Sequence, residues 1–286
     1  MNFHKGKSRI NMAKILIGAD PELFLRNPNN GSFVSGHIFN LGDKKNPCPV
    51  PFGAVQNDGC AVEFNIDPAA TVQEFVHNTQ HVLETLRSMT PGYNLCMEPV
   101  ADFDKDYFDK EVPMKSKELG CDPDYNAWTG MANDPPDNTQ PMRTASGHIH
   151  IGWTDGADVQ DAKHFANCCA VAKQMDYYLG IHSLRWDQDN RRRSMYGQAG
   201  AFRPKPYGCE YRVLSNRWLS SEPLMRWVYH SAVRGVGHLI EEGQSAAEMY
   251  GDLARDIING NVVDWPSKHN LNIPVPAPPG FNKAVA

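Results

Sequence analysis

The feature of this sequence that most restricts its fold is a pair of polar residues, two positions apart, that recurs in four apolar segments. The pairs are Asp20 and Glu22, Glu63 and Asn65, His148 and His150, and Glu210 and Arg212. In a β-strand, residues i and i+2 point to the same side of the sheet. The residues between and beside the pairs are mostly apolar. We therefore expect a sheet with an apolar face toward the core and a second face that carries carboxylates, imidazoles and a guanidinium.

The order of the predicted elements indicates the fold class. Strands are predicted over residues 14–17, 22–25, 61–66, 93–100, 147–153 and 207–214. Helices are predicted to begin at Thr71, Asp158, Ser221 and Ser245, of which the first and last open the capping-box patterns Thr71/Glu74 and Ser245/Glu248. Because helices do not follow every strand, the order is not that of a parallel βαβ array. We predict an α+β fold, with an antiparallel sheet and helices packed on one face.

Three segments flank or interrupt the predicted domain of residues 12–262. Residues 1–11 are basic and are not followed by a long apolar stretch, so we expect a flexible extension rather than a secretory signal. Residues 263–286 are rich in proline and are expected to form an extended tail. Residues 101–142 contain many Asp, Pro and Asn and little periodicity. Long ordered loops of this kind are commonly lids or binding loops.

Composition excludes several classes of function. The net charge of −5 argues against a protein that chiefly binds nucleic acid. Because there is no run of about 18 apolar residues, we expect no membrane span. The seven cysteines are scattered, odd in number and without a C-x-x-C motif. This usage favours reduced thiols and a cytoplasmic location over a disulfide framework or a zinc ribbon.

The residue types in the four pairs favour a metal site. Carboxylate, imidazole and amide groups are ligands for Mg²⁺ or Mn²⁺. Glycines lie close to every pair and would allow a ligand to approach the backbone closely; they are Gly18, Gly59, Gly147, Gly152 and Gly208. The alternative is an ordinary solvent-exposed sheet face, which also shows polar alternation. Such faces use Thr, Ser and Lys freely, so the repeated ligand-type residues favour a site.

Arginines supply candidates for binding phosphate. Neither a Walker A motif nor a G-x-G-x-x-G fingerprint occurs, so a bound ATP would have to be held by metals and arginines. The candidate cofactor-binding residues are Arg143 and His148 around the SGHIHIG segment, and Arg191, Arg193 and Arg203 around SMYGQAGAF, where Arg192 is also found. Guanidinium groups suit phosphates and carboxylates, although a solvated loop is the alternative for any one of them. Arg212 shares a strand face with Glu210, where it could hold a transferring phosphoryl group.

Four segments, GADPELFL, DGCAVEFN, SGHIHIG and YGCEYRVLSN, together resemble the phage-type carboxylate–amine ligase family. That family belongs to the glutamine synthetase and glutamate–cysteine ligase superfamily, and the resemblance spans about residues 12–240. It implies a glutamine synthetase-like catalytic fold, with an antiparallel sheet curved around a metal–nucleotide site. It also implies an acyl-phosphate mechanism with ATP and Mg²⁺ or Mn²⁺. The partners would be a carboxylate and an amine, such as an amino acid, peptide or polyamine, and a homo-oligomer is compatible with it. A phage-encoded chain would act in the host cytoplasm.

The resemblance also implies roles for particular residues. The metal ligands would be Asp20, Glu22, Glu63, Asn65, His150 and Glu210. Asn65 stands where these ligases often have a carboxylate. The catalytic residues would be Glu63, Glu210 and Arg212, with Arg212 binding the phosphoryl group.

Two other functions are compatible with the same residues. A metal-dependent hydrolase could use His148 and His150 with the acidic residues, and it would turn over without ATP. A non-catalytic binding protein on the same fold would tolerate the loss of Glu63 and Glu210. The near-complete set of acidic positions argues against the second alternative.

Overall fold

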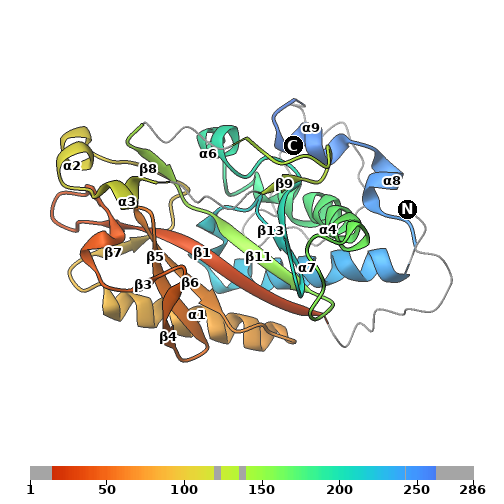
Figure 1. Cartoon of the computed structure of the whole chain (residues 1–286), viewed down its shortest axis with the longest axis horizontal. Coiled ribbons are helices and arrows are strands. Elements are labelled where there is room, and N and C mark those ends of the chain that lie inside the picture. The colour runs from red at the N-terminus through yellow and green to blue at the C-terminus, as the bar shows by residue number, and fades with distance from the viewer. Residues whose placement is uncertain (1–14, 119–123, 135–139, 242, 262–286) are drawn as a thin grey trace, which may run out of the picture.

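The computed structural model describes residues 15–118, 124–134, 140–241 and 243–261. The predicted N-terminal extension and the proline-rich tail lie outside these residues, so both remain predictions, as does the single-domain division. Figure 1 shows one large sheet with helices around it. The sheet order is β3-β4-β5-β6-β1-β11-β13-β12-β9, and β2 and β7 also pair with β1. All of these strand pairs are antiparallel.

The strands differ greatly in length, and β1 is the longest. The large sheet comprises β1 (Leu16–Arg26), β2 (Phe33–Val34), β3 (Gly42–Asp43), β4 (Asn46–Val50), β5 (Gly53–Asp58), β6 (Ala61–Ile66), β7 (Asn94–Cys96), β9 (Tyr125–Asn126), β11 (Gly147–Gly152), β12 (Ala201–Lys205) and β13 (Gly208–Tyr211). A separate pair is formed by β8 (Val100–Asp102) and β10 (Met142–Thr144). Strand β1 lies near the middle of the order, and it pairs with β11 along its first half and with β6 and β7 along its second half.

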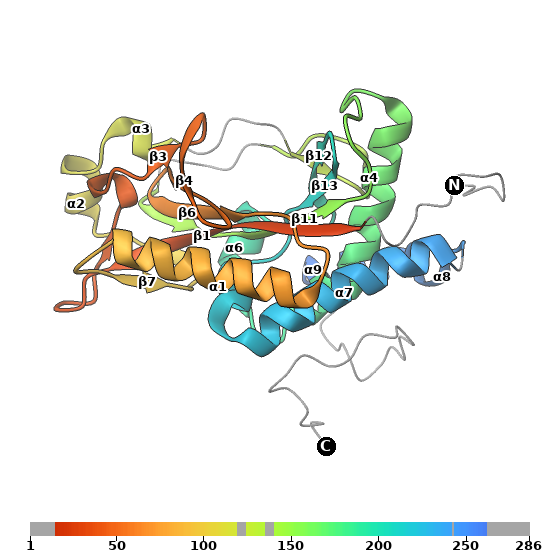
Figure 2. The same ribbon diagram turned by 90° about the horizontal axis from the view of Figure 1, so that it is seen from below.

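The three longest helices cover one face of the sheet, on which the large apolar cluster lies. The helices are α1 (Val72–Met89), α2 (Lys105–Lys110), α3 (Met114–Lys117), α4 (Ala162–Met175), α5 (Ile181–Ser183), α6 (Asn190–Met195), α7 (Glu222–Glu241), α8 (Ala246–Tyr250) and α9 (Leu253–Ile258). Figure 2 shows α1 and α7 running side by side beneath the sheet. A π-helical turn over Asp176–Gly180 continues α4. The α+β class and the antiparallel sheet are as predicted from the sequence.

Strand alternation builds the core. On β11, Ile149 and Ile151 have no exposed surface and join the large apolar cluster beneath the sheet. Val62 and Phe64 of β6 do the same. The polar members of each strand point to the opposite face because the side-chain period of a strand is two.

Both predicted capping boxes are confirmed. The Thr71 hydroxyl accepts a hydrogen bond from the Glu74 backbone N–H, and the Glu74 carboxylate accepts one from the Thr71 N–H. Ser245 and Glu248 make the same reciprocal pair at α8. Each box satisfies N–H groups that a helix start otherwise leaves without partners.

Several predicted boundaries were wrong. The helix expected from Asp158 is capped by Asp161, whose carboxylate accepts from the His164 N–H, while Asp158 caps only a turn at Gln160. The strand expected over 207–214 is β13 alone, and the strand expected over 93–100 is split between β7 and the start of β8. The polar segment 185–206 contains α6 and β12, and α2, α3, β8 and β9 lie in the segment 101–142 that was expected to be irregular.

The described part of the chain contains neither a membrane-spanning helix nor a disulfide. Within it, no helix is both long and apolar enough to span a membrane. The six cysteines found there are all thiols. The cytoplasmic location stays a prediction.

Candidate functional site

A cavity of about 1260 Å³ lies over the polar face of the sheet. Strands β1, β5, β6, β11 and β12 all contribute to its lining. The predicted residues that line it are Asp20, Glu22, Glu63, Asn65, Arg143, His148, His150, Arg203 and Arg212. Glu210 has no exposed surface and lies in contact with three of them, His148, Arg203 and Arg212.

Strand register brings the predicted pairs together. Asp20 on β1 is directly opposite His148 on β11, and Glu22 is opposite Glu63 on β6. On the other side of β11, His150 is opposite Glu210 of β13. Residues far apart in the sequence therefore form one continuous polar surface.

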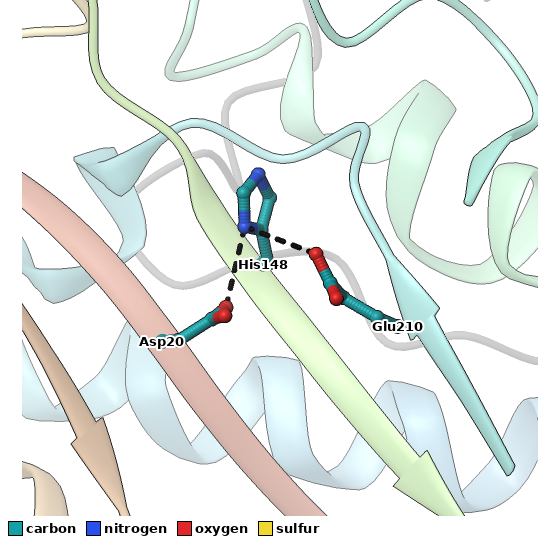
Figure 3. Close-up of side chains that lie close together, drawn as sticks. All are labelled: Asp20, His148 and Glu210. Carbon is teal, nitrogen blue, oxygen red and sulfur yellow. Dashed lines mark ion pairs between the residues drawn. The ribbon is translucent and has the colours of Figure 1, made fainter. Parts of the chain in front are cut away.

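Three of these residues form a compact group. The ligand atoms of Asp20, His148 and Glu210 all lie within 4.8 Å of one another. Figure 3 shows their side chains converging from β1, β11 and β13. His148 Nδ1 is 3.2 Å from Asp20 Oδ1 and 3.6 Å from Glu210 Oε1. Two carboxylates and one imidazole are a donor set that Mg²⁺ or Mn²⁺ can use.

Polar atoms in this group lack hydrogen-bond partners. Asp20 Oδ1 also lies 2.9 Å from His150 Nε2, yet among the described residues it has no partner with hydrogen-bond geometry. His148 Nε2 is likewise buried and without such a partner in that part of the chain. Burial and the nearby Arg212 lower the pKa of His148 to about 4, so its imidazole is neutral at pH 7. Buried atoms without partners are rare in proteins, and an ion bound between the three side chains would satisfy Asp20 Oδ1.

Glu210 gathers three cationic side chains. Lys205 Nζ is 2.8 Å from its Oε2, Arg203 Nη1 is 3.2 Å from its Oε1, and Arg212 Nη1 also donates to Oε1. Burial opposes ionisation of this carboxyl, but Arg212 and the other nearby positive charges, Arg203 among them, hold the pKa of Glu210 well below its usual range. Glu210 is therefore ionised and keeps the cations together at the β12–β13 side of the cavity.

Besides Glu210, two residues hold the Arg212 side chain in place. Its Nη2 donates to the Tyr196 hydroxyl, and its guanidinium carbon lies 5.1 Å from the centroid of the Tyr196 ring. Its Nε lies 3.5 Å from Asp124 Oδ2. The predicted phosphoryl-binding arginine is therefore fixed in place at the cavity.

Carboxyl groups crowd together at the β5–β6–β1 side. Burial and repulsion from Asp58 raise the pKa of Glu22 to about 8, and the same two causes raise the pKa of Glu63 well above its usual range. Glu22 Oε2 accepts from the Ser146 N–H at 2.8 Å, and Glu63 Oε2 accepts from Gln56 Nε2 at 2.6 Å. With a pKa of about 8, Glu22 holds a proton at neutral pH, and a divalent cation could take the place of that proton.

Three predicted arginines serve other contacts. Arg143 lines the cavity but donates to the backbone carbonyls of Gln140, Met142 and Lys117. Arg191 and Arg193 do not line the cavity. Arg191 is half-exposed and pairs with Asp189 and Asp102, at 2.8 Å in each case. Arg193 contacts the carboxylate and the carbonyl of Asp187.

Several residues that line the cavity were not predicted from the sequence, and four of them have polar groups close to the predicted site. Asp58 ends β5, Tyr196 follows α6, Lys205 ends β12, and Tyr207 contacts His150 Nδ1 through its hydroxyl. A signal existed for Lys205, because it is two positions from Arg203 and two residues so spaced share a strand face. It was not used because residues 185–206 are polar and rich in arginine, and no strand was predicted in them.

Residues 143–245 match a protein-family model described as phage phiEco32-like COOH.NH2 ligase-type 2. The matched part contains β11, β12 and β13, and it therefore includes His148, Arg203, Glu210 and Arg212. The match points to a carboxylate–amine ligase. A comparison with curated proteins finds no match.

Among solved structures, the chain is similar to a bifunctional glutathione synthetase from Pasteurella multocida. The TM-score is 0.50 and the identity 12%, over 87% of this chain and 41% of that chain. It also matches a novel glutamine synthase homolog with a TM-score of 0.34 and 12% identity, over 87% of this chain and 64% of that one. The chain thus spans less than two thirds of the length of either structure, and a likeness at 12% identity concerns the fold alone.

The likeness to the glutathione synthetase structure and the sheet topology agree with the antiparallel-sheet α+β fold expected from the sequence. The match over β11–β13 was also expected from the segments SGHIHIG and YGCEYRVLSN. The predicted resemblance is therefore confirmed: in residues 143–245 this chain is similar to the phage-type carboxylate–amine ligases.

Proposed function

We propose that this protein is an ATP-dependent ligase that joins a carboxylate to an amine on the open face of its sheet. One observation carries the proposal: a single cavity holds clustered carboxyl groups on its β5–β6–β1 side and clustered cations on its β12–β13 side. Acids suit divalent ions, and cations suit phosphate. The family match over residues 143–245 supports the same reaction class.

The residues present fit a divalent metal ion. Asp20, His148 and Glu210 supply two carboxylates and a neutral imidazole within bonding reach of one ion. Glu22 and Glu63 are further oxygen donors in the same cavity. Mg²⁺ or Mn²⁺ bound there would neutralise charge on the phosphates of ATP.

The cationic side suits a phosphoryl group in transfer. Arg203 and Lys205 lie on β12, Arg212 directly follows β13, and all three line the cavity. Arg212 is held by Tyr196 and Asp124, so its guanidinium is already in place before substrate binds. Donors fixed in advance stabilise developing charge without reorganising during the reaction.

The proposed reaction has two steps. An oxygen of the substrate carboxylate attacks the γ-phosphorus of ATP, the bond to the β–γ bridging oxygen breaks, and ADP leaves. The amine nitrogen then attacks the carbonyl carbon of the acyl phosphate, and inorganic phosphate leaves as the amide forms and one proton is released. Arg212 would stabilise charge on the phosphoryl oxygens, and the walls of the cavity would limit access of water to the acyl phosphate.

The cavity has room for more than one ligand. Its volume of about 1260 Å³ exceeds the roughly 300–1,000 Å³ of an ordinary small-molecule pocket. Simultaneous binding of ATP, an acid and an amine requires such space. The acid and the amine are proposed as amino acids, peptides or polyamines.

ADP release tests this proposal. The protein is incubated with Mg-ATP and pooled carboxylic acids and amines, and we expect ADP to form only when both pools are present. Glu63→Gln is the informative variant. Because burial and the nearby carboxyl groups raise the pKa of Glu63 well above its usual range, a neutral group is favoured at this position, and the melting temperature should change little when the amide replaces the carboxyl. We expect ADP formation to fall by at least about 100-fold, since the amide supplies no anionic ligand.

The matched control is Glu222→Gln, which changes an exposed carboxylate that pairs with Arg226 on α7. It should leave ADP formation unchanged. If no acid or amine provokes ADP release, or if Glu63→Gln is as active as the unaltered protein, the ligase proposal is wrong. Turnover of an amide or ester without ATP would instead favour the metal-dependent hydrolase.

A further inference from the structure

Arg192 is fully buried beneath the cavity. It stands between Arg191 and Arg193 on α6, but its side chain points inward and has no exposed surface. Its Nη1 donates to the Val213 carbonyl at 2.7 Å. Its Nη2 donates to the Leu214 carbonyl at 2.8 Å, the Ser146 hydroxyl at 3.0 Å and the Arg212 carbonyl at 3.3 Å.

All four acceptors of Arg192 are neutral oxygens. Burying a guanidinium is costly, and an ion pair with a carboxylate is the usual compensation. Here the guanidinium instead fixes three consecutive carbonyls of the chain that leaves β13. A planar group with five donors is suited to hold such a segment in one conformation.

These bonds reach two residues of the proposed site. Ser146, which accepts from Arg192, donates its backbone N–H to Glu22 Oε2 at 2.8 Å and accepts from the Glu22 N–H at 2.9 Å. The carbonyl of Arg212 accepts from Arg192. Its guanidinium donates to Tyr196, which lies four residues after Arg192 in the chain. Arg192 thus reaches a proposed metal ligand through Ser146 and contacts the proposed phosphoryl-binding arginine directly.

The chain is shaped to accommodate this guanidinium. Gly197 has φ of 79°, and a Cβ at that position would lie 2.4 Å from Arg192 Nη1 and 2.8 Å from its Cζ. Only glycine leaves this space while adopting the left-handed conformation readily. The turn after α6 therefore closes against Arg192.

We propose that Arg192 is a positioning residue for the metal-binding face, acting on Glu22 through Ser146 and on Arg212 through its carbonyl. The inference rests on the proposed function, because it assigns Glu22 and Arg212 their roles there. Arg192 contacts neither substrate nor metal in this role. Its effect is to keep the Glu22 carboxylate of β1 and the Arg212 guanidinium, which follows β13, at fixed places.

A role of Arg192 through its charge and a role through positioning predict opposite effects of Arg192→Met on cation binding. Arg192 carries a positive charge that interacts with Glu22. If Arg192 acted by charge alone, the neutral variant Arg192→Met would bind a cation more tightly, because a nearby positive charge is removed. If Arg192 positions Glu22, the same variant binds the cation more weakly. Arg192→Lys keeps the charge but cannot reproduce a planar fork with four acceptors.

The test measures the dissociation constant of Mn²⁺ by electron paramagnetic resonance of the free ion, below the melting temperature of each variant. We expect Arg192→Met and Arg192→Lys to raise this constant by about 10-fold or more, as loss of supporting hydrogen bonds does at metal sites. Ser146→Ala removes only the hydroxyl and should raise it by a smaller factor. Arg191→Lys, on the exposed side of the same helix, should leave it unchanged.

The inference is overturned if the Mn²⁺ dissociation constants of Arg192→Met and Arg192→Lys stay within twofold of that of the unaltered protein, even where the melting temperatures fall. That result would leave the proposed function intact. If neither variant folds, Ser146→Ala decides, because an unchanged constant for that variant also overturns it. If the unaltered protein binds no Mn²⁺, the proposed function fails first, and the inference that rests on it fails with it.

Discussion

Asp20 on β1 stands directly opposite His148 on β11, with 3.2 Å between Asp20 Oδ1 and His148 Nδ1. The contact links the two central strands of the polar face, and Glu210 approaches the same imidazole nitrogen from β13. Two carboxylates therefore flank one neutral imidazole. This arrangement gives the first prediction.

Asp20→Asn should weaken Mn²⁺ binding. The amide keeps the shape of the side chain but removes the negative charge, so we expect the dissociation constant to rise by at least about 10-fold. Calorimetric titration with Mn²⁺ measures it. Asp102→Asn is the matched control, because Asp102 is largely exposed and pairs with Arg191 outside the cavity. Equal affinities for the two variants would contradict a metal role for Asp20.

Glu210→Gln should destabilise the metal-free protein. Glu210 is the buried anion that compensates Arg203, Lys205 and Arg212, and its loss leaves their charges without that partner. We expect the free energy of unfolding to fall by about 3 kcal/mol or more, as for other broken buried pairs. Urea denaturation at pH 7 measures this change.

The control for that experiment is Glu222→Gln, which breaks the exposed pair with Arg226. Exposed ion pairs contribute little to stability, so the loss should be small. Similar losses for Glu210→Gln and Glu222→Gln would show that the charges around Glu210 are not held by it.

Gly197→Ala should cost more stability than Gly156→Ala. Both glycines have positive φ, 79° and 65°, so both variants bear the cost of roughly 1–2 kcal/mol of placing an alanine there. A Cβ at Gly156 would meet nothing within 4 Å, whereas one at Gly197 would collide with Arg192. The excess loss at Gly197, of roughly 1–3 kcal/mol, reports that collision. Equal melting temperatures for the two variants would show that the turn after α6 does not close on Arg192.

Asp176 should make stability depend on pH. Burial raises the pKa of this carboxyl to about 7, even though it accepts hydrogen bonds from Trp128 Nε1 and the Tyr211 hydroxyl. The folded state then binds more protons than the unfolded state between about pH 4 and pH 7. The free energy of unfolding should therefore fall as the pH rises through that window, by at most about 4 kcal/mol from this group.

The measurement compares the pH dependence of urea unfolding for the unaltered protein and for Asp176→Asn. The variant should be less stable at pH 5, and its stability should fall less between pH 5 and pH 7. Parallel curves would show that Asp176 titrates normally in the folded protein.

Much of the polar face could be predicted because strand geometry is simple. The i, i+2 rule alone places Asp20 with Glu22 and His148 with His150 on one side of a sheet. It does not tell which strand lies beside which. The contact between Asp20 and His148 depends on the register of β1 with β11, which follows from long-range pairing.

The arginines of α6 show where the sequence is insufficient. Arg191, Arg192 and Arg193 are adjacent and chemically identical, yet one is half-exposed, one is fully buried and one contacts Asp187. Their directions follow from the helical turn of about 100° per residue and from what each side meets. Because α6 lies in a polar segment without apolar periodicity, the helix itself was not predicted.

Strand β12 was not predicted either. Pro204 lies within it and, by lacking an N–H, is disfavoured in a strand interior. In the structure β12 nevertheless pairs with both β13 and β9, and it delivers Arg203 and Lys205 to the cavity. The pairing with β9 covers only Ala201 and Phe202, so Pro204 lies where β12 has a paired strand on one side only, as proline in a sheet commonly does.

Transfer of oxygen from acid to phosphate tests the central claim most directly. The protein is given Mg-ATP, unlabelled amines and pooled carboxylic acids whose carboxylate oxygens are ¹⁸O, and the released inorganic phosphate is examined by mass spectrometry. Attack of the carboxylate on the γ-phosphorus predicts one ¹⁸O atom in each phosphate formed with the amide. Phosphate that carries no ¹⁸O, although ADP is released, would contradict an acyl-phosphate ligase.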